Sequence, residues 1–324
     1  MAVPVVYVDV PPALEAELFG DGLEQGLRGI GRLVRKGDGG GRLQADVLVT
    51  GWGSEPLPER LAPEDNLRLV VHSAGTIRSL VPQALLSRGV RASQASAGMA
   101  QSVAELALYM TIARLRDLDR IDRVMAGAHD WRGADFGLAR TLADSTVGVI
   151  GASRVGRAYL QLSVAAGSEV LVYDPYLDEQ EAKRLGARLV PLETLLGQST
   201  VVALHAPVRR ETRHMLDAPR LALIPDGGVV VNTARSALVD TDALLAEVRS
   251  GRLSAALDVF DDEPLPLDSE WWQLPNVLLT PHLGARTWHS RRAQGSIAVD
   301  EVRRYLTGRD LRHEVLPETY DLMA

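Results

Sequence analysis

Short apolar runs alternate with segments of helical periodicity along most of the chain. The runs of the first series are Val5–Val10, Ala45–Thr50, Leu67–Ser73 and Val90–Ala95. Between them, helical patterns lie around Leu14–Phe19 and Pro82–Ser87. Apolar runs that alternate with helices are typical of βαβ units, in which helices connect the strands of a parallel sheet. This part of the chain is therefore predicted to form one parallel α/β domain.

A second series of runs is almost continuously apolar, as expected of strands that are covered on both faces. Its members are Thr146–Ile150, Glu169–Asp174, Ala187–Pro191, Ser199–Pro207, Gly227–Arg235, Leu253–Phe260 and Asn276–His282. Helical spacing over Gln101–Met125 predicts one long helix before this series, and Ser290–Leu306 is predicted to be the last helix. The predicted fold class is α/β, with two doubly wound parallel-sheet domains joined near Ala97 and Arg286.

Composition narrows the class of protein. The chain has 324 residues, enough for two domains, and a net charge of −7, which argues against nucleic acid or an anionic membrane as a partner. It has no cysteine, and its histidines show no metal-ligand spacing, so no metal site is predicted. The N-terminus lacks the basic segment of a signal peptide, and no apolar stretch reaches the roughly 18 residues of a membrane helix. We expect a cytoplasmic protein.

The turn after the first run of the second series reads "GASRVG" and resembles a dinucleotide-binding fingerprint. Gly151 can make the tight turn, Gly156 can let helix and strand pack closely, and Ser153 stands where the fingerprint has its middle glycine. A helix over Val155–Ala166 is predicted to follow. Asp174 ends the next strand, which matches the acid expected roughly 20 residues further on to bind a ribose. The turn is predicted to bind a dinucleotide.

The residues of this turn also suggest which dinucleotide binds. Ser153 is tolerated if its φ is negative, and its hydroxyl can then donate to a phosphate oxygen. Arg154 adds a cation at a helix N-terminus, which already favours anions. Asp174 would repel a 2′-phosphate, so NAD is the predicted cofactor. The alternative is a purely structural strand-to-helix turn.

Three late strands of the second series end in residues suited to chemistry: Arg235, Glu263 and His282. Ligands of open α/β sheets bind outside the carboxyl ends of the strands, so these side chains are expected to converge. Histidine exchanges protons near neutral pH, a neighbouring carboxylate stabilises its charged form, and arginine can hold a substrate carboxylate with two hydrogen bonds. Each residue alone could instead be structural, but together they predict a site for carbonyl–alcohol redox chemistry.

Several motifs, in this order, resemble signatures of the D-isomer-specific 2-hydroxyacid dehydrogenases. The resemblance covers most of the chain and is strongest from Ala100 to Thr287. The motifs are "VAE" (Val103–Glu105), "TVGVIGASRVGR" (Thr146–Arg157), "VYDPY" (Val172–Tyr176), "LHAPVRRETRHML" (Leu204–Leu216), "VVVNTARSALVDTDAL" (Val229–Leu244), "AALDVFDDEPLP" (Ala255–Pro266) and "LTPHLGA" (Leu279–Ala285).

The resemblance implies an NAD-dependent oxidoreductase acting on a small 2-keto or D-2-hydroxy acid, with Arg235 catalytic, Glu263 polarising His282, and His282 as acid/base. It also implies a Rossmann NAD domain (98–287) inserted into a discontinuous, flavodoxin-like substrate domain (1–97 and 288–324). The long helix after Ala97 resembles the element that forms dimers in the family, so a homodimer is expected. The implied cofactor contacts are Ser153, Arg154, Val155, Asp174, His205, Ala206, Thr212, Thr233, Ala234, Asp258 and Gly284.

The chain departs from the family pattern at Ser153, at Ser236, where a glycine is common, and in the loop "HSAGTIRSL". This loop carries Ile77 where the family has a second glycine, so the resemblance leaves the identity of the substrate open. Ile77 is expected to fill the space that this glycine leaves open, and Trp52 is expected to form an apolar wall of the substrate pocket. Loops after the strands of the first series are expected to hold the substrate. The candidate substrate-binding residues are Trp52, Ala74, Gly75, Thr76 and Arg235.

Other functions remain open from the sequence. Phosphite or formate oxidation on the same scaffold is one alternative, although formate dehydrogenases of this fold carry glutamine where this chain has Glu263. A non-catalytic NAD-sensing regulatory protein is another. A methyltransferase that uses S-adenosylmethionine fits the glycine turn but leaves Arg235, Glu263 and His282 unexplained.

Overall fold

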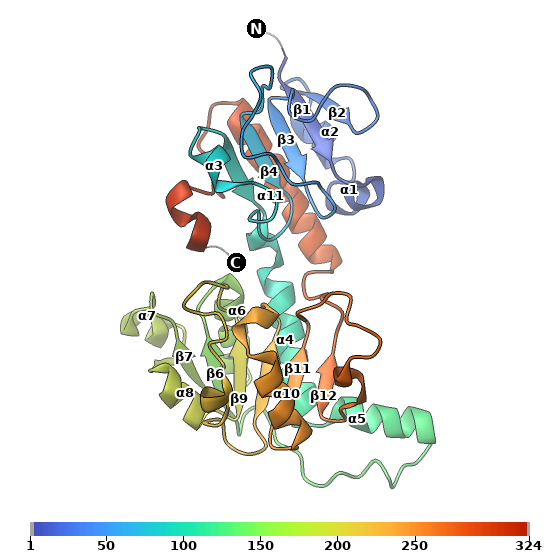
Figure 1. Cartoon of the computed structure of the whole chain (residues 1–324), viewed down its shortest axis with the longest axis vertical. Coiled ribbons are helices and arrows are strands. Elements are labelled where there is room, and N and C mark those ends of the chain that lie inside the picture. The colour runs from blue at the N-terminus through green and yellow to red at the C-terminus, as the bar shows by residue number, and fades with distance from the viewer. Residues whose placement is uncertain (1–2, 323–324) are drawn as a thin grey trace. The chain divides into compact units, whose positions relative to one another are not determined.

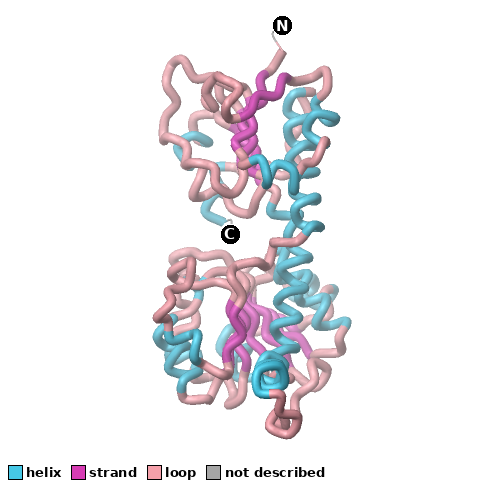
Figure 2. The backbone as a smooth tube through the Cα atoms, turned by 90° about the vertical axis from the view of Figure 1, so that its right-hand side faces the viewer, coloured by secondary structure: helices cyan, strands magenta, loops and turns pink. Residues whose placement is uncertain are grey.

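The computed structural model describes residues 3–322. The chain forms two compact units. The first runs to Ala100 and resumes at Ala285, and the second is Gln101–Gly284. In both units a parallel sheet is enclosed by helices (Figure 2). Within the described residues, no helix is both long and apolar enough to cross a membrane.

The first unit has a five-stranded parallel sheet in the order β2-β1-β3-β4-β5 (Figure 1). This is the flavodoxin-type order of doubly wound folds, as the resemblance implied. The strand bounds are β1 Val5–Asp9, β2 Arg32–Arg35, β3 Val47–Thr50, β4 Leu69–His72 and β5 Arg91–Gln94. The sequence did not predict β2, because this edge strand has an arginine at each end and only two apolar residues between them.

Helices cover both faces of this sheet. One face packs against the apolar sides of α1 (Pro12–Leu18), α2 (Gly22–Leu27) and α11 (Trp288–Leu306), which contribute Leu18, Leu23 and Val302 to the core. The other face packs against α3 (Gln83–Leu86) and the short 3-10 helix η5 (Pro317–Leu322). Another 3-10 helix, η1 (Ser96–Met99), packs against α11.

The second unit has a seven-stranded parallel sheet in the order β12-β11-β10-β9-β6-β7-β8. Its chain order reverses at β6, which is the arrangement of a Rossmann fold with one further strand. All seven predicted runs form strands. Their bounds are β6 Thr146–Ile150, β7 Glu169–Tyr173, β8 Arg188–Leu189, β9 Val201–Leu204, β10 Val229–Asn232, β11 Ser254–Leu257 and β12 Val277–Leu279.

Two buried clusters, one on each face of this sheet, form the core of the second unit. The α-helices between and before the strands are α4 Ala100–Leu115, α5 Leu118–Asp122, α6 Arg154–Ala165, α7 Glu179–Arg184, α8 Leu192–Gln198, α9 Ala218–Leu221 and α10 Thr241–Arg249. Two 3-10 helices, Ser236–Leu238 and Glu270–Gln273, follow β10 and β11. The two-domain α/β fold predicted from the sequence is confirmed.

The single long helix predicted over Gln101–Met125 is wrong in one respect. It breaks at Asp117, which has a φ of +51°, and continues as α5 and a wide π-helical turn, Arg123–Ala128. At this break the buried guanidinium of Arg114 pairs with Asp117 at 2.9 Å and with Asp119. Asp119 is five residues after Arg114, beyond the i,i+3 and i,i+4 spacings that face each other on a straight α-helix, and periodicity alone does not reveal such a pairing.

Candidate active site

The glycine turn lies at the carboxyl end of β6, where the strand order of the second unit reverses. Gly151 has a φ of +95°, and a Cβ there would stand 2.6 Å from the backbone nitrogen of Ala206. A Cβ at Gly156 would lie 1.9 Å from the carbonyl oxygen of Gly151. Both positions therefore require glycine, and the turn keeps the close backbone cradle that a dinucleotide phosphate needs.

Ser153 fits this cradle without strain. Its φ is −63°, and it is the N-cap of α6, where its hydroxyl accepts a hydrogen bond from the backbone N–H of Gly156 at 3.2 Å. Arg154 opens the helix on the exposed side, and half-buried Val155 follows it. Serine in place of the middle glycine thus gives α6 a side-chain cap, since serine is among the preferred N-cap residues.

Asp174 is tied to the same turn. Its Oδ2 accepts the backbone N–H of Ala152 at 2.7 Å, and its Oδ1 accepts that of Tyr176 at 2.8 Å. Asp174 therefore links the loop after β7 to the glycine turn after β6. This arrangement fits a ribose hydroxyl pair beside the phosphate cradle.

The predicted cofactor contacts after β9 have different environments. His205 is 4 % exposed beneath the glycine turn, its ring centroid 4.9 Å from that of Tyr159, and burial lowers the pKa of His205 to about 3. It is thus a neutral packing residue at physiological pH. Ala206 is buried, and Thr212 holds the following loop by accepting from the N–H of Arg209 and donating to the carbonyl of Pro207.

The loop after β10 carries Thr233, Ala234 and Arg235. Asn232 fixes this loop by accepting the N–H of Ala234 at 3.0 Å and donating to the carbonyl of Arg235 at 2.8 Å. Thr233 is buried, and Ser236 begins the 3-10 helix that follows. Burial lowers the pKa of the Arg235 guanidinium, and the charge of Glu263 partly opposes that shift. Arg235 therefore lies within electrostatic reach of Glu263.

His282 and Glu263 form a hydrogen-bonded pair. Nδ1 of His282 lies 2.6 Å from Oε2 of Glu263, while Oε1 of Glu263 accepts the backbone N–H of Phe260 at 3.0 Å. The carboxylate thus fixes both the ring orientation and the tautomer, with the proton on Nδ1 facing it. This leaves Nε2 to exchange a proton with a reacting group, and the His282 side chain is half-exposed.

Asp258 holds the turn that carries His282. Its Oδ1 accepts from the Thr280 hydroxyl at 2.6 Å and from the N–H of Leu283 at 2.9 Å, and its Oδ2 accepts from the N–H of Gly284 at 2.9 Å. The residue is 1 % exposed. His282 itself has a φ of +49°, a conformation unusual for a residue with a side chain. The sequence suggested Asp258 and Gly284 only as cofactor contacts and missed this anchoring.

The predicted substrate residues Trp52, Ala74, Gly75 and Thr76 belong to the first unit, after strands β3 and β4. Ala74 is buried, whereas Gly75 and Thr76 are half-buried. The guanidinium of Arg291 lies over the Trp52 ring, 4.0 Å from its centroid, and Arg291 Nε pairs with Glu17 at 3.2 Å. Trp52 therefore offers a cation-bearing surface where the sequence suggested an apolar one. No sequence signal distinguished Arg291 from the other arginines of α11.

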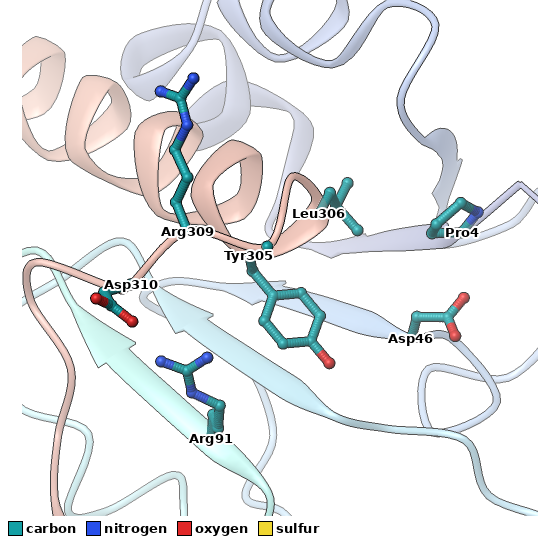
Figure 3. Close-up of a pocket in the computed structure, with 8 residues that line it drawn as sticks. Pro4, Asp46, Arg91, Tyr305, Leu306, Arg309 and Asp310 are labelled. Carbon is teal, nitrogen blue, oxygen red and sulfur yellow. The ribbon is translucent and has the colours of Figure 1, made fainter.

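Ile77 differs from expectation, because it is fully buried in the core of the first unit and does not fill a pocket. Two pockets of the first unit are lined by other residues than the predicted ones. One, of about 480 Å³, lies where the strands begin and includes Asp46, Arg91 and Tyr305 (Figure 3). The other, of about 660 Å³, lies where β1 and β2 end.

Comparison with known proteins identifies the family of the chain. Residues 108–284 match the family described as D-isomer specific 2-hydroxyacid dehydrogenase, NAD binding domain. The chain belongs to this family. It is 34 % identical over 266 residues to a D-3-phosphoglycerate dehydrogenase of Mycobacterium leprae, covering 82 % of this chain and 50 % of the relative. It thus spans about half the length of that relative.

Two further similarities cover most of both chains. A hydroxypyruvate reductase of Thermotoga maritima is 31 % identical, over 80 % of this chain and 84 % of the relative. The structure of a D-lactate dehydrogenase from Aquifex aeolicus, in complex with NAD and lactic acid, matches with a TM-score of 0.75 and 26 % identity. That match covers 94 % of this chain and 96 % of the other. The cofactor of the family domain is NAD, as predicted.

Proposed function

We propose that this protein is an NAD-dependent dehydrogenase that interconverts a small 2-keto acid and the matching D-2-hydroxy acid. The hydrogen-bonded pair of His282 and Glu263 carries the proposal, because it lies in the same unit as the glycine turn and Arg235. We assign cofactor binding to the unit Gln101–Gly284 and substrate binding chiefly to the other unit.

The residues of the turn fit the cofactor. The phosphates would lie against the N-terminus of α6 at Ser153, Arg154 and Val155, with a ribose on Asp174. The residues proposed to line the remainder of the cofactor site are Gly151, Gly156, His205, Ala206, Thr212, Thr233, Ala234, Asp258 and Gly284. Bound NADH supplies the hydride for the carbonyl carbon.

The protein's own groups handle the proton and the substrate. In the reducing direction, Nε2 of His282 gives its proton to the carbonyl oxygen, while Glu263 stabilises the charged imidazolium that precedes the transfer. Arg235 is the proposed partner of the substrate carboxylate in the second unit. The proposed substrate contacts of the first unit are Trp52, Ala74 and the amides of Gly75 and Thr76. In the oxidising direction, neutral His282 accepts the hydroxyl proton.

A panel of 2-keto acids tests the proposal, with NADH consumption as the readout. Glyoxylate, pyruvate and hydroxypyruvate are expected to be reduced more efficiently than 3-phosphohydroxypyruvate. A preference for the phosphorylated acid would contradict this substrate class. NADH binding without turnover of any acid would instead favour an NAD-sensing protein. Oxidation of phosphite or formate with NAD would favour a phosphite or formate dehydrogenase.

We also propose that the protein is a homodimer and works in the cytoplasm, where NAD is recycled between its two redox states. Support for self-association comes from large apolar side chains exposed within one stretch of the second unit: Tyr109, Ile112, Leu118, Trp131 and Leu138. Light scattering after gel filtration tests this. Ile112→Glu is expected to yield monomers, whereas Leu223→Glu, at an exposed leucine outside this stretch, is expected to leave a dimer intact.

A further inference from the structure

Residues 312–322, called the tail segment below, fold back along the edge of the first unit's sheet. Ser93 of β5 and Glu314 form an antiparallel bridge. The N–H of Gln94 donates to the carbonyl of His313 at 3.2 Å, and the N–H of Val315 donates to that of Ala92 at 2.8 Å. The tail segment therefore extends the parallel sheet by one antiparallel pairing on the outer side of β5.

Charged side chains fix the start of this segment. Arg91 donates two hydrogen bonds of 2.7 Å to the carboxylate of Glu314, and Arg91 also borders the pocket in Figure 3. The fully buried carboxylate of Glu301 in α11 accepts the backbone N–H groups of Arg312 and His313 at 2.9 and 3.2 Å. Hydrogen bonds to charged groups are stronger than those between neutral groups, so this end of the segment is firmly held.

The far end of the tail segment reaches the loop after β4. Tyr320 is 8 % exposed, and its ring belongs to the same core cluster as Ile77, Leu80 and Val81. Its hydroxyl donates to the carbonyl of Val81 at 2.8 Å and lies 3.1 Å from that of Arg78. The single phenolic proton thus points to the end of the loop that carries Gly75 and Thr76, with the carbonyl of Val81 as the nearer acceptor.

The end of this loop is packed into the core. Residues 74–81 form no strand or helix, but the side chains of Ile77, Leu80 and Val81 are buried, whereas Gly75 and Thr76 are only half-buried. The carbonyl of Ile77 accepts the N–H groups of Leu80 and Val81, which forms a tight turn beneath Tyr320. Buried carbonyls without a partner are costly, so the phenol stabilises this turn in one conformation.

We propose that Tyr320 is a positioning residue for the substrate loop. By donating to the carbonyl of Val81, close to that of Arg78, it fixes the turn that follows Gly75 and Thr76, whose amides are the proposed contacts of the substrate carboxylate. This inference rests on the proposed function, because that function makes Gly75 and Thr76 substrate contacts. Tyr320 acts on substrate affinity and leaves the proton and hydride steps to the other unit.

Tyr320→Phe tests the proposal, since it keeps the ring in the core and removes only the hydroxyl. The KM of this variant for the keto acid is expected to rise by about 2- to 12-fold, because a hydrogen bond contributes roughly 0.5–1.5 kcal/mol net. The kcat and the Kd for NADH are expected to stay within about twofold. Tyr305→Phe is the matched control, because Tyr305 borders the pocket where the strands begin, and its KM is expected to be unchanged.

Hydrogen exchange provides a readout that needs no substrate. In Tyr320→Phe, the amides of Leu80 and Val81 are expected to exchange faster, while those of β3 and β4 keep their protection. Unchanged KM and unchanged exchange would overturn the proposal, as would a parallel loss of kcat, NADH affinity and thermal stability. If the unmutated protein reduces no keto acid, the proposed function fails, and the exchange experiment still decides whether Tyr320 anchors the loop.

Discussion

Nδ1 of His282 lies 2.6 Å from Oε2 of Glu263, although the two residues come from loops after different strands. A carboxylate in this position holds the ring so that Nε2 faces away from it. The same carboxylate stabilises the imidazolium that must form before a proton is given to a carbonyl oxygen.

His282→Ala is expected to lower kcat by roughly 10²- to 10⁴-fold, because general acid–base catalysis is lost. Glu263→Gln keeps a hydrogen-bonding group but not the charge, so an intermediate loss is expected. Steady-state kinetics and NADH titration are the measurements, and NADH binding should survive in both variants. His289→Ala, at an exposed histidine, serves as the control. Near-normal turnover of His282→Ala would refute the assignment.

Asp258→Asn is expected to loosen the turn that carries His282. The variant replaces one carboxylate oxygen, which accepts a hydrogen bond, with an NH₂ group that faces a backbone N–H. The lost hydrogen bond is expected to lower the free energy of unfolding by about 1–3 kcal/mol. We therefore expect lower stability together with a reduced kcat, measured by denaturant unfolding and kinetics. Asp261→Asn, at an exposed acid three residues later, should change neither. Weaker NADH binding at unchanged stability would mean that Asp258 acts only on the cofactor.

Asp174→Ala is expected to weaken NADH binding by about 10- to 100-fold, as expected for lost hydrogen bonds to a charged group. It should also erode the preference for NAD over NADP, because the carboxylate that repels a 2′-phosphate is gone. Calorimetry with both cofactors measures this. Equal catalytic efficiency with NAD and NADP in the unmutated protein would contradict the role of Asp174.

Ser153→Gly is expected to leave NADH affinity unchanged or slightly better and stability within a few tenths of a kcal/mol, because glycine is also a good N-cap. Ser153→Ala removes the cap to the N–H of Gly156 and should cost about 1 kcal/mol. Thermal unfolding and NADH titration separate the two effects. A large loss of affinity in Ser153→Gly would show that the hydroxyl itself binds the cofactor.

Acid is expected to destabilise the fold through His205. Burial lowers the pKa of His205 to about 3 from 6.5, so below pH 6.5 the unfolded chain binds a proton that the folded chain does not. The unfolding free energy therefore falls as the pH drops from 6.5 towards 3, by about 2 kcal/mol at pH 5 for this group.

His205→Asn should show a shallower fall than the unmutated protein in denaturant unfolding at several pH values. His289→Asn, at an exposed position, should keep the original slope. Parallel pH profiles for His205→Asn and the unmutated protein would show that the buried imidazole is not the cause.

The sequence by itself determined the two parallel sheets, the glycine turn and the placement of Asp174, Arg235 and His282 at strand ends. These features depend on short-range patterns. An apolar run bounded by turns specifies a buried strand, and the strands of a parallel sheet end at the same edge. Only glycine fits at position 151, so a glycine at this place in the sequence pattern was enough to predict the tight turn.

Tertiary structure decided the features that join distant parts of the chain. Asp258 reaches Gly284 across two strand ends, Arg291 covers Trp52, and Tyr320 binds the carbonyl of Val81, 239 residues away in sequence. Each is a single polar side chain with no periodic neighbours, so the sequence pattern contains no signal for its partner. The partner of each side chain is the donor or acceptor that the folded unit brings within about 3 Å of it, and this distance depends on the packing of the whole unit.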